Sequence, residues 1–260
     1  MIPENIQRLF QTKCGNQKQD MTQTYPDDCV QGIIEPEKSW WVECEGHENR
    51  RGRLVWAFIP HVGQMPCTLI PVEIGDDPTQ HKVAKVRIEP TDIKSLVRYP
   101  KLPIPSLPHR KNEVRTVYLA KKRPALIISG GGPWIQKELI KDKPNWQTYP
   151  SVIVAPYYGA GESGYRSGYN PVFMTRVRHC EYPQFVWDKL PIGSGPKESI
   201  MRLDHMQPIP RNQNSIEFTS HCLRESALLI LDEWIEWLIT GNLEKDGSLC
   251  ETRDFLFDFS

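Results

Sequence analysis

The sequence predicts an α+β fold that is rich in β-strands and has one long helix near its C-terminus. Short runs of β-branched and aromatic residues recur through most of the chain, whereas extended helical spacing of apolar residues is confined to about His221–Thr240. Many strands followed by a single helix favour an α+β fold, or a small barrel closed by a helix, over alternating β and α units. The 260 residues, 10% of them aromatic, suffice for one or two folded units.

Turn residues and prolines separate the strand candidates. Arg53–Pro60 is β-branched and aromatic, and it ends at a proline that has no amide hydrogen for a sheet. A turn at 75–78 predicts a hairpin between the strands on either side. Four prolines within Tyr99–Pro108 predict an extended connector. The predicted strands are 40–42, 53–60, 67–74, 82–88, 114–119, 123–129, 151–156, 172–179 and 199–209.

The helix near the C-terminus shows the clearest pattern. Apolar residues recur at three- and four-residue spacing, which predicts one face packed on the sheet. Ser220 or Thr219 is the expected N-cap, and Gly241 is the expected end. The apolar positions are Leu223, Ala227, Leu228, Ile230, Leu231, Trp234, Ile235 and Leu238.

Zero net charge conceals an uneven distribution. From Asn214 onward there are ten acidic and three basic residues, a net charge of −7, so residues 1–213 carry +7. The segment Lys101–Arg123 alone has seven basic residues and one acid, a net charge of +6. Such a basic region is typical of polyanion binding, although solvated loops explain it equally well.

The chain lacks the signatures of export, membrane insertion and common cofactors. No apolar run is long enough for a membrane span, and the N-terminus does not resemble a signal peptide. Seven scattered cysteines without a CxxC pair favour reduced thiols in the cytoplasm over a disulfide framework. The Cys44–His47 spacing has no second ligand pair, and no nucleotide, hydrolase or metalloprotease motif occurs. We therefore expect no cofactor, no bound metal and a cytoplasmic location.

Five short segments, taken in their order along the chain, form a pattern that is more specific than any one of them. They are Gly52-Arg-Leu-Val-Trp56, then Lys122-Arg-Pro-Ala-Leu-Ile-Ile-Ser129, Val152-Ile-Val-Ala-Pro156, Glu198-Ser-Ile-Met-Arg-Leu-Asp-His-Met206, and the helix. This succession resembles the PemK/MazF family of toxin ribonucleases over residues 52–60 and about 121–240. The resemblance implies an SH3-like barrel of the PemK/MazF type with a C-terminal helix, here with an N-terminal extension and a large insertion.

The resemblance also implies metal-independent cleavage of single-stranded RNA. Such cleavage requires a base for the 2′-hydroxyl, an acid for the leaving 5′-oxygen and a cation near the phosphorane. Asp204 matches the family's base, Arg202 its acid and Arg123 its charge-stabilising arginine. Arg202 and Asp204, two residues apart on a predicted strand, would project from the same face. On spacing alone, an exposed ion pair on one strand face is the better explanation, and only the neighbouring segments of the resemblance make a catalytic pair comparable to it.

Several residues around this motif are candidate RNA contacts. The MazF branch has a threonine where this chain has Tyr158, and tyrosines there could stack on bases. The candidates are Tyr157, Tyr158, Tyr165, Ser199, Lys121 and Lys122. The PemK branch also has a histidine before its Arg-Pro pair, and His61 and His109 fit that position equally well.

Three parts are expected along the chain. They are an N-terminal extension at 1–50, a PemK/MazF-like barrel at 51–245 with an insertion at about 61–112, and an acidic-aromatic tail at 246–260. The tail resembles antitoxin segments that occupy the RNA groove of these toxins, although a strand of the barrel is an equally good interpretation. Expected partners are single-stranded RNA and an antitoxin-like or regulatory protein, and the family's dimers suggest a homodimer.

Two functions from different classes follow. The first is a toxin-like endoribonuclease acting in defence or stress response. The second is a non-catalytic module of the same fold that binds RNA or a protein partner, which the tyrosine at 158 and the large insertion favour. An enzyme of small-molecule metabolism unrelated to the family is the third alternative.

Overall fold

The computed structural model describes residues 25–36, 38–77, 79–80, 83–92, 113–148, 150–161, 168–193, 197–211 and 214–258. The chain divides into two units, each described separately below. Unit 1 comprises Met1–Ala57 together with Lys122–Ser260, and unit 2 comprises Phe58–Lys121. The predicted insertion at 61–112 falls within unit 2. The residues 1–24, the predicted connector at 99–108, Tyr165 and His109 lie outside the described residues.

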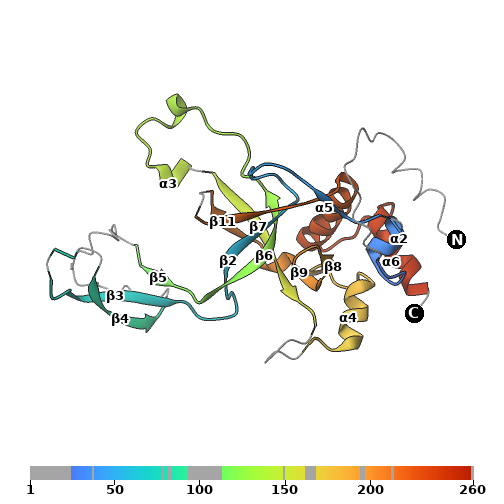
Figure 1. Ribbon diagram of the computed structural model, residues 1–260, viewed down its shortest axis with the longest axis horizontal. Helices are drawn as coiled ribbons and strands as arrows, with labels where there is room; N and C mark the ends of the chain where they lie inside the picture. The colour runs from blue at the N-terminus through green and yellow to red at the C-terminus, as the bar shows by residue number, and fades with distance from the viewer. Residues whose placement is uncertain are drawn as a thin grey trace. The chain divides into compact units, whose positions relative to one another are not determined.

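An antiparallel sheet is the framework of unit 1 (Figure 1). Its strand order is β1-β11-β2-β6-β7-β9-β8, and β10 pairs with the same strand β7. The strands are β1 (Trp41–Glu43), β2 (Arg53–Pro60), β6 (Ala120–Ser129), β7 (Ser151–Gly159), β8 (Phe185–Leu190), β9 (Lys197–Arg202), β10 (Gln207–Pro210) and β11 (Ile216–Leu223). The strand-rich α+β class is therefore confirmed.

The sheet of unit 1 is open. Among the described strands, β1 and β8 are its two ends and do not pair with each other. Barrel closure requires the end strands to pair, so the described strands do not form the closed SH3-like barrel that the resemblance implies. β8 was not predicted, because its buried Trp187 and Asp188 interrupt a simple alternation of apolar and polar residues.

Helices α2, α5 and α6 lie together beside this sheet (Figure 1). Helix α5 contacts α6, and α6 contacts α2, so segments from both ends of the chain meet. Helix α4 packs on β8, and the strand predicted at 172–179 is therefore wrong. The helices are α2 (Val30–Ile34), α3 (Asn145–Thr148), α4 (Pro171–Arg178), α5 (Glu225–Thr240) and α6 (Ser248–Asp258), with 3₁₀ turns at Lys137–Ile140 and Leu203–His205.

Helix α5 ends where the sequence predicts but begins later. Gly241 stops it in the left-handed conformation, with φ of 75°. The predicted N-caps Ser220 and Thr219 are wrong, because both belong to strand β11, which pairs with β2 and β1. The helix starts at Glu225, directly after Arg224, whose Nε donates to the carbonyl of Ser39 at 2.6 Å.

The acidic-aromatic tail is a helix. Residues Ser248–Asp258 form α6, whose Leu249, Thr252 and Leu256 are buried. The backbone amide of Leu249 donates to Glu233 of α5 at 2.8 Å. The predicted extended segment lying in an RNA groove is therefore wrong, and so is the alternative of a barrel strand, because this segment is helical and packs against α5 and α2.

Large aromatic side chains fill the core of unit 1. Trp41, Tyr157, Trp187 and Trp234 are almost completely buried, and they come from β1, β7, β8 and α5. The carboxylate of Asp188 lies among them and accepts hydrogen bonds from Tyr25 Oη at 3.2 Å, Trp41 Nε1 at 3.1 Å and Tyr157 Oη at 3.4 Å. These bonds connect the segment before α2 to three strands of the sheet.

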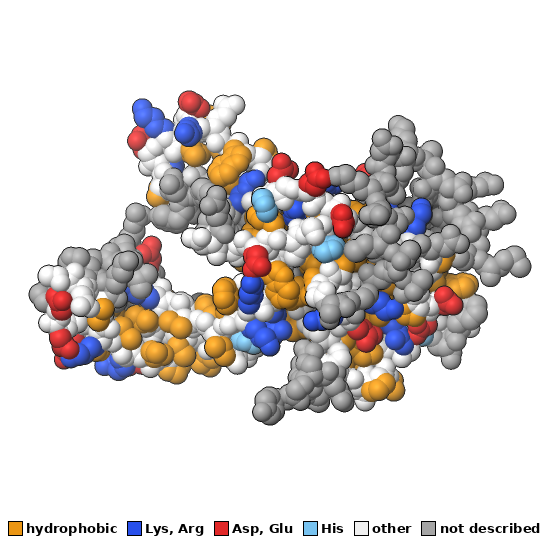
Figure 2. All heavy atoms as spheres, viewed as in Figure 1, with side chains coloured by type: hydrophobic (Ala, Val, Ile, Leu, Met, Phe, Trp, Pro, Cys, Tyr) orange, Lys and Arg blue, Asp and Glu red, His pale blue; other side chains and the backbone are white. Residues whose placement is uncertain are grey.

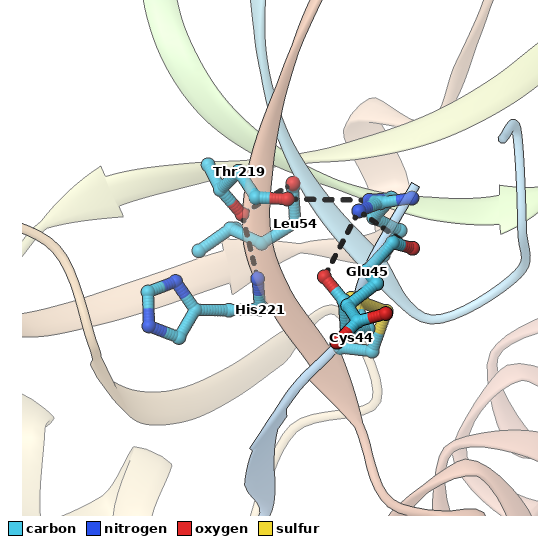
Figure 3. Close-up of a disulfide and its surroundings, with 7 residues drawn as sticks. Cys44, Glu45, Leu54, Thr219 and His221 are labelled. Carbon is cyan, nitrogen blue, oxygen red and sulfur yellow. Dashed lines mark hydrogen bonds between the residues drawn. A yellow bond between two sulfur atoms is a disulfide. The ribbon is translucent and has the colours of Figure 1, made fainter. Parts of the chain in front are cut away.

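A disulfide joins Cys44 to Cys222 (Figure 3). The two residues flank the β1–β11 pairing, where Cys222 lies opposite Val42, and their Cα atoms are 5.9 Å apart. The guanidinium of Arg53 donates to the carbonyls of Thr219 and Cys44, both at 3.2 Å. The expectation that these thiols are reduced is wrong, because a sheet pairing brings together cysteines 178 positions apart.

Unit 2 contains a three-stranded antiparallel sheet of order β4-β3-β5. The predicted hairpin is confirmed by β3 (Cys67–Ile74) and β4 (Ala84–Pro90), and β5 (Thr116–Val117) pairs with β3. In β4 the charged residues Lys85 and Arg87 alternate with Val86 and Ile88. Figure 2 shows apolar side chains gathered on the surface of this unit, where Ile88 is 59% exposed.

Candidate active site

The candidate site lies in unit 1, at the point where strand β7 stops pairing with β9 and pairs with β10 instead. Residues Tyr157–Gly159 of β7 pair with β9, while Ser151–Val154 pair with β10. Between β9 and β10 the chain leaves the sheet in the 3₁₀ turn Leu203–His205. Pro156 of β7 lies at this interruption and has no amide hydrogen to donate. The interruption places the Arg202–His205 segment beside the middle of β7.

Two strands bring Arg123 next to Tyr158. Ala125 of β6 pairs with Pro156 of β7, and antiparallel continuation of this register leads to Arg123 and Tyr158 on the two strands. The Arg123 guanidinium carbon lies 4.3 Å from the centre of the Tyr158 ring. This is cation–π geometry, in which the ring face attracts the positive charge.

Tyr158 connects this arginine to the turn after β9. Its hydroxyl lies 2.9 Å from Nδ1 of His205, and which atom donates depends on the imidazole tautomer. The two rings meet edge to face, with centroids 5.5 Å apart. The other ring nitrogen of His205, Nε2, lies 3.8 Å from Oδ2 of Asp204. A continuous chain of contacts therefore runs from Arg123 through Tyr158 and His205 to Asp204.

Arg202 and Asp204 form a bidentate ion pair. Nε of Arg202 donates to Oδ1 at 2.7 Å, and Nη2 donates to Oδ2 at 2.5 Å. The guanidinium carbon also lies 4.7 Å from the centre of the Phe185 ring. This geometry fixes the guanidinium plane, because the carboxylate of Asp204 binds its edge and the Phe185 ring contacts its face.

The electrostatics of the cluster favour one charge state for each group. Burial, together with the positive charges of Arg202 and Arg123, lowers the pKa of His205, against the opposing effect of Asp204. Burial raises the pKa of Tyr158, although both arginines oppose the shift. Burial alone would raise the pKa of Asp204, but the hydrogen bonds and charge of Arg202 lower it. At neutral pH the site therefore combines a neutral imidazole, a protonated phenol and a carboxylate.

The side chains of the site remain accessible. Arg202, Asp204 and His205 keep 23%, 31% and 17% of their side-chain surface exposed, so a ligand can reach them. A neutral imidazole can accept a proton, a phenol can donate one, and two guanidinium groups can stabilise negative charge. These are the kinds of group that phosphodiester cleavage by an adjacent hydroxyl requires.

The structure places the predicted catalytic residues in one cluster but does not favour their predicted roles. Both carboxylate oxygens of Asp204 accept hydrogen bonds from Arg202, and its pKa is lowered, so it is a weak base. The hydrogen bond to Asp204 raises the pKa of Arg202, which makes this arginine a poor acid. The two groups in the cluster whose charge states suit acid–base chemistry are the phenol of Tyr158 and the imidazole of His205.

His205 is the residue that sequence reasoning missed. It directly follows Asp204 in the segment that carries the resemblance, and that adjacency was the available signal. Of the two histidines considered instead, His61 belongs to unit 2 and His109 lies outside the described residues.

Two predicted RNA contacts point into the protein. Tyr157 is 2% exposed, and its hydroxyl is bonded to Asp188, so the expectation that it stacks on bases is wrong. Ser199 is 4% exposed and donates to the carbonyl of Lys197 at 3.2 Å. Strand alternation explains why Tyr157 is buried, because its side chain points to the opposite face of the sheet from that of Tyr158.

The predicted lysines lie outside the cluster. Lys122 forms an ion pair with Glu217 of β11 and lies 5.8 Å from the centre of the Trp56 ring. Lys121 is exposed and belongs to unit 2. Of the six predicted RNA contacts, only Tyr158 is shown to be part of the cluster.

The part of the chain that the structure describes contains no group of three or more His, Cys, Asp or Glu residues arranged to hold a metal ion. Cys44, half of the one pair with ligand spacing, is bound in the disulfide. None of the helices in the described ranges has the length and apolar character needed to cross a membrane.

Protein-family models, curated proteins and solved structures were each compared with this chain, and none of them matches it.

Proposed function

We propose that this protein is a metal-independent endoribonuclease that cleaves single-stranded RNA at the cluster of Arg123, Tyr158, Arg202, Asp204 and His205. The observation that carries the proposal is the convergence of a neutral imidazole, a protonated phenol and two arginines from three segments of one sheet. The resemblance to the PemK/MazF family and its role in defence belong to the same proposal, here with the family's SH3-like barrel in an open form.

The reaction is a transesterification within the RNA strand. Nε2 of His205 accepts the proton of a 2′-hydroxyl, whose oxygen attacks the neighbouring phosphorus. The bond from phosphorus to the 5′-oxygen breaks, and the hydroxyl of Tyr158 gives its proton to that oxygen. An alkoxide is far more basic than a phenolate, so this transfer is downhill. The products are a 2′,3′-cyclic phosphate and a 5′-hydroxyl.

The other charged groups stabilise the transition state. Arg123 packs against the ring of Tyr158, and Arg202 approaches the same tyrosine closely enough to affect its pKa. Both guanidinium groups can therefore meet the negative charge that develops on the phosphorane oxygens. Asp204 is a positioning residue, because its two hydrogen bonds fix the plane of Arg202.

The experiment is cleavage of a mixed-sequence single-stranded RNA in the presence of EDTA. We expect wild-type protein to produce 2′,3′-cyclic phosphate ends, and His205→Ala to lose at least about a hundredfold in rate. His47→Ala, which changes an exposed histidine outside the cluster, is the matched control and should cleave normally. Absence of cleavage by wild type, or cleavage that requires a metal, would contradict the proposal.

One observation favours a second function, that of a non-catalytic RNA-binding module. Arg202 occupies both oxygens of Asp204, so the residue that matches the family's base is not free. In that case wild type would bind single-stranded RNA with an affinity that falls as salt rises, and would leave it intact. The same assay, followed by a binding measurement, distinguishes the two functions.

A further inference from the structure

Four aromatic side chains form a continuous cluster beside the candidate active site. Phe173 of α4 contacts Tyr169 and Tyr182 at centroid distances of 5.5 and 5.8 Å, and contacts Phe185 of β8 at 5.4 Å. Tyr182 and Phe185 also meet edge to face at 5.9 Å. We call these four residues the aromatic cluster.

The cluster has a fixed base and one exposed end. Phe173, Tyr182 and Phe185 pack against the hydrophobic core, so their ring positions are set by the fold. Tyr169 is 38% exposed and immediately precedes Asn170, the N-cap of α4, whose side chain accepts from the amide of Val172 at 2.8 Å. The capped helix and the contact with the packed ring of Phe173 therefore hold the exposed ring of Tyr169 in place.

The aromatic cluster is continuous with the active site. The guanidinium of Arg202 lies over the ring of Phe185, 4.7 Å from its centre. Tyr169 interacts electrostatically with both Tyr158 and Arg202, which places its hydroxyl end near the acid–base pair. At the other side, Arg176 lies 5.0 Å from the centre of the Tyr182 ring. An aromatic surface is thus flanked by two guanidinium groups.

We propose that Tyr169 is a stacking site for a base of single-stranded RNA, in the nucleotide next to the phosphate held by Arg123 and Arg202. This inference rests on the proposed function for its ligand. A rigid exposed ring beside guanidinium groups suits a single-stranded nucleic acid, because the ring stacks on a base while the cations face the backbone. Stacking of this kind accepts any base, since each has a π-face.

A structural role for the cluster predicts a different result. Contact between Tyr169 and Phe173 at the start of α4 would stabilise the helix without involving a ligand. Removing the Tyr169 ring would then lower the melting temperature and leave the RNA affinity of the folded protein unchanged. Measurements of both quantities on the same variant separate the two roles.

The test is binding of two oligonucleotides to the full chain in EDTA at low salt, measured by fluorescence anisotropy. The first is a single-stranded 2′-O-methyl RNA, which lacks the attacking hydroxyl and is not cleaved. The second has the same backbone without bases. We expect wild type to bind the first about tenfold more tightly than the second, and Tyr169→Ala to lose this preference. Tyr169→Phe should keep it, because the ring is retained.

Val172→Ala is the matched control, since it removes an exposed side chain, 68% exposed, from the same helix outside the cluster. It should retain the wild-type preference. A wild type that binds both oligonucleotides equally, or that binds neither, would overturn the stacking site. So would a folded Tyr169→Ala that retains the preference.

The test of the stacking site can succeed or fail independently of the test of the nuclease. Stacking that depends on Tyr169, together with intact 2′-hydroxyl RNA after incubation with wild type, would contradict the nuclease and support the stacking site. Cleavage by wild type with no effect of Tyr169→Ala on base-dependent binding would support the nuclease and overturn the stacking site.

Discussion

Two hydrogen bonds join the guanidinium of Arg202 to the carboxylate of Asp204, two residues further along the chain. Arg202 ends strand β9, and Asp204 lies in the 3₁₀ turn that follows it. The carboxylate therefore compensates one of the two positive charges in the cluster and fixes its direction. Arg123 contributes the other positive charge through its position on the Tyr158 ring.

Replacing this carboxylate should separate binding from cleavage. In Asp204→Asn the charge of Arg202 is no longer compensated, so RNA affinity at low salt should rise. The slope of log Kd against log salt should steepen by about 0.7, the value for one additional phosphate contact on a single strand. Cleavage should fall by about tenfold or more, because the guanidinium loses its fixed plane. Anisotropy over a salt series and a cleavage time course measure the two effects.

Asp232→Asn is the control for this charge change. It removes one carboxylate from the exposed ion pair between Asp232 and Arg51, elsewhere on unit 1. It should leave cleavage unchanged. If Asp204→Asn lowered RNA affinity instead of raising it, the carboxylate would contact the ligand directly, and the positioning role would be wrong.

The pH dependence of cleavage should report His205. Burial and two arginines lower its pKa below the ordinary value of 6.5, and the neutral imidazole is the base form. The rate should therefore rise as pH increases through that lowered pKa and be constant at neutral pH. The pKa of Tyr158 is raised above 10, so the loss of its proton should not limit the rate until strongly alkaline pH.

A pH–rate profile of kcat/KM between pH 4.5 and 9 tests this prediction, because it reports the free enzyme. His205→Ala should remove the acid limb along with most of the rate. A limb centred well above pH 6.5 would contradict the assignment, since it would require an imidazole stabilised in its charged form.

The sequence predicted most strands of the described chain because their signals are local. β2 was predicted with its observed bounds, and the hairpin of unit 2 followed from alternation around a turn. The start of α5 was predicted wrongly because apolar spacing continues into β11, whose pairing with β2 overrides it. The helical tail α6 was missed because its buried side depends on contact with α5 and α2.

Four of the five residues in the cluster were predicted from the sequence, whereas His205 and the contacts between the side chains were not. Arg123, Arg202 and Asp204 follow from short motifs, and the structure brings all three to one cluster. Their roles depend on which groups bond to each other, and a sequence does not contain that information. Because Asp204 is paired with Arg202 and Tyr158 with His205, the proposed mechanism gives the acid–base role to the second pair.

Reduction of the disulfide should destabilise unit 1. The Cys44–Cys222 bridge closes a loop of 178 residues, so chain entropy alone predicts a loss of up to about 5 kcal/mol when it is removed. Strand β1, only three residues long, depends on it at one end of the sheet. Thermal unfolding with and without dithiothreitol should show a lower melting temperature in the reduced protein.

Cys44→Ser combined with Cys222→Ser is the control for nonspecific effects of the reductant. This double variant should melt like the reduced wild type and should not respond to dithiothreitol. If wild type melted at the same temperature in both conditions, the bridge would contribute nothing to stability. The bridge lies on β1 and β11, away from β6, β7 and β9, so reduced protein that remains folded should keep its RNA affinity.

Asp188 should make stability depend on pH, because its carboxyl is fully buried among aromatic rings. Burial raises its pKa to about 7, although hydrogen bonds from Lys189, Tyr25, Trp41 and Tyr157 oppose the shift. An unfolded chain has the ordinary value near 3.8. The folded state therefore holds a proton that the unfolded state releases, and this contribution to stability is lost as pH rises from about 4 to about 7.

The measurement is urea unfolding of wild type and Asp188→Asn at pH 5 and pH 7.5. Asparagine resembles the protonated carboxyl but does not titrate, so the free-energy cost of the substitution should be larger at pH 5. The difference between the two pH values should be on the order of a few kcal/mol. Other groups that titrate in this range occur in both proteins, and their effects cancel in the comparison.

Tyr25→Phe is the matched control for losing a hydrogen bond without losing the acid. It removes the 3.2 Å contact to Asp188 Oδ1 and should cost about 1 kcal/mol. Because the Tyr25 hydroxyl favours the charged carboxylate, its removal should keep the pKa of Asp188 raised, and the pH dependence should persist. An equal cost of Asp188→Asn at both pH values would show that the carboxyl has the same charge in the folded and unfolded states.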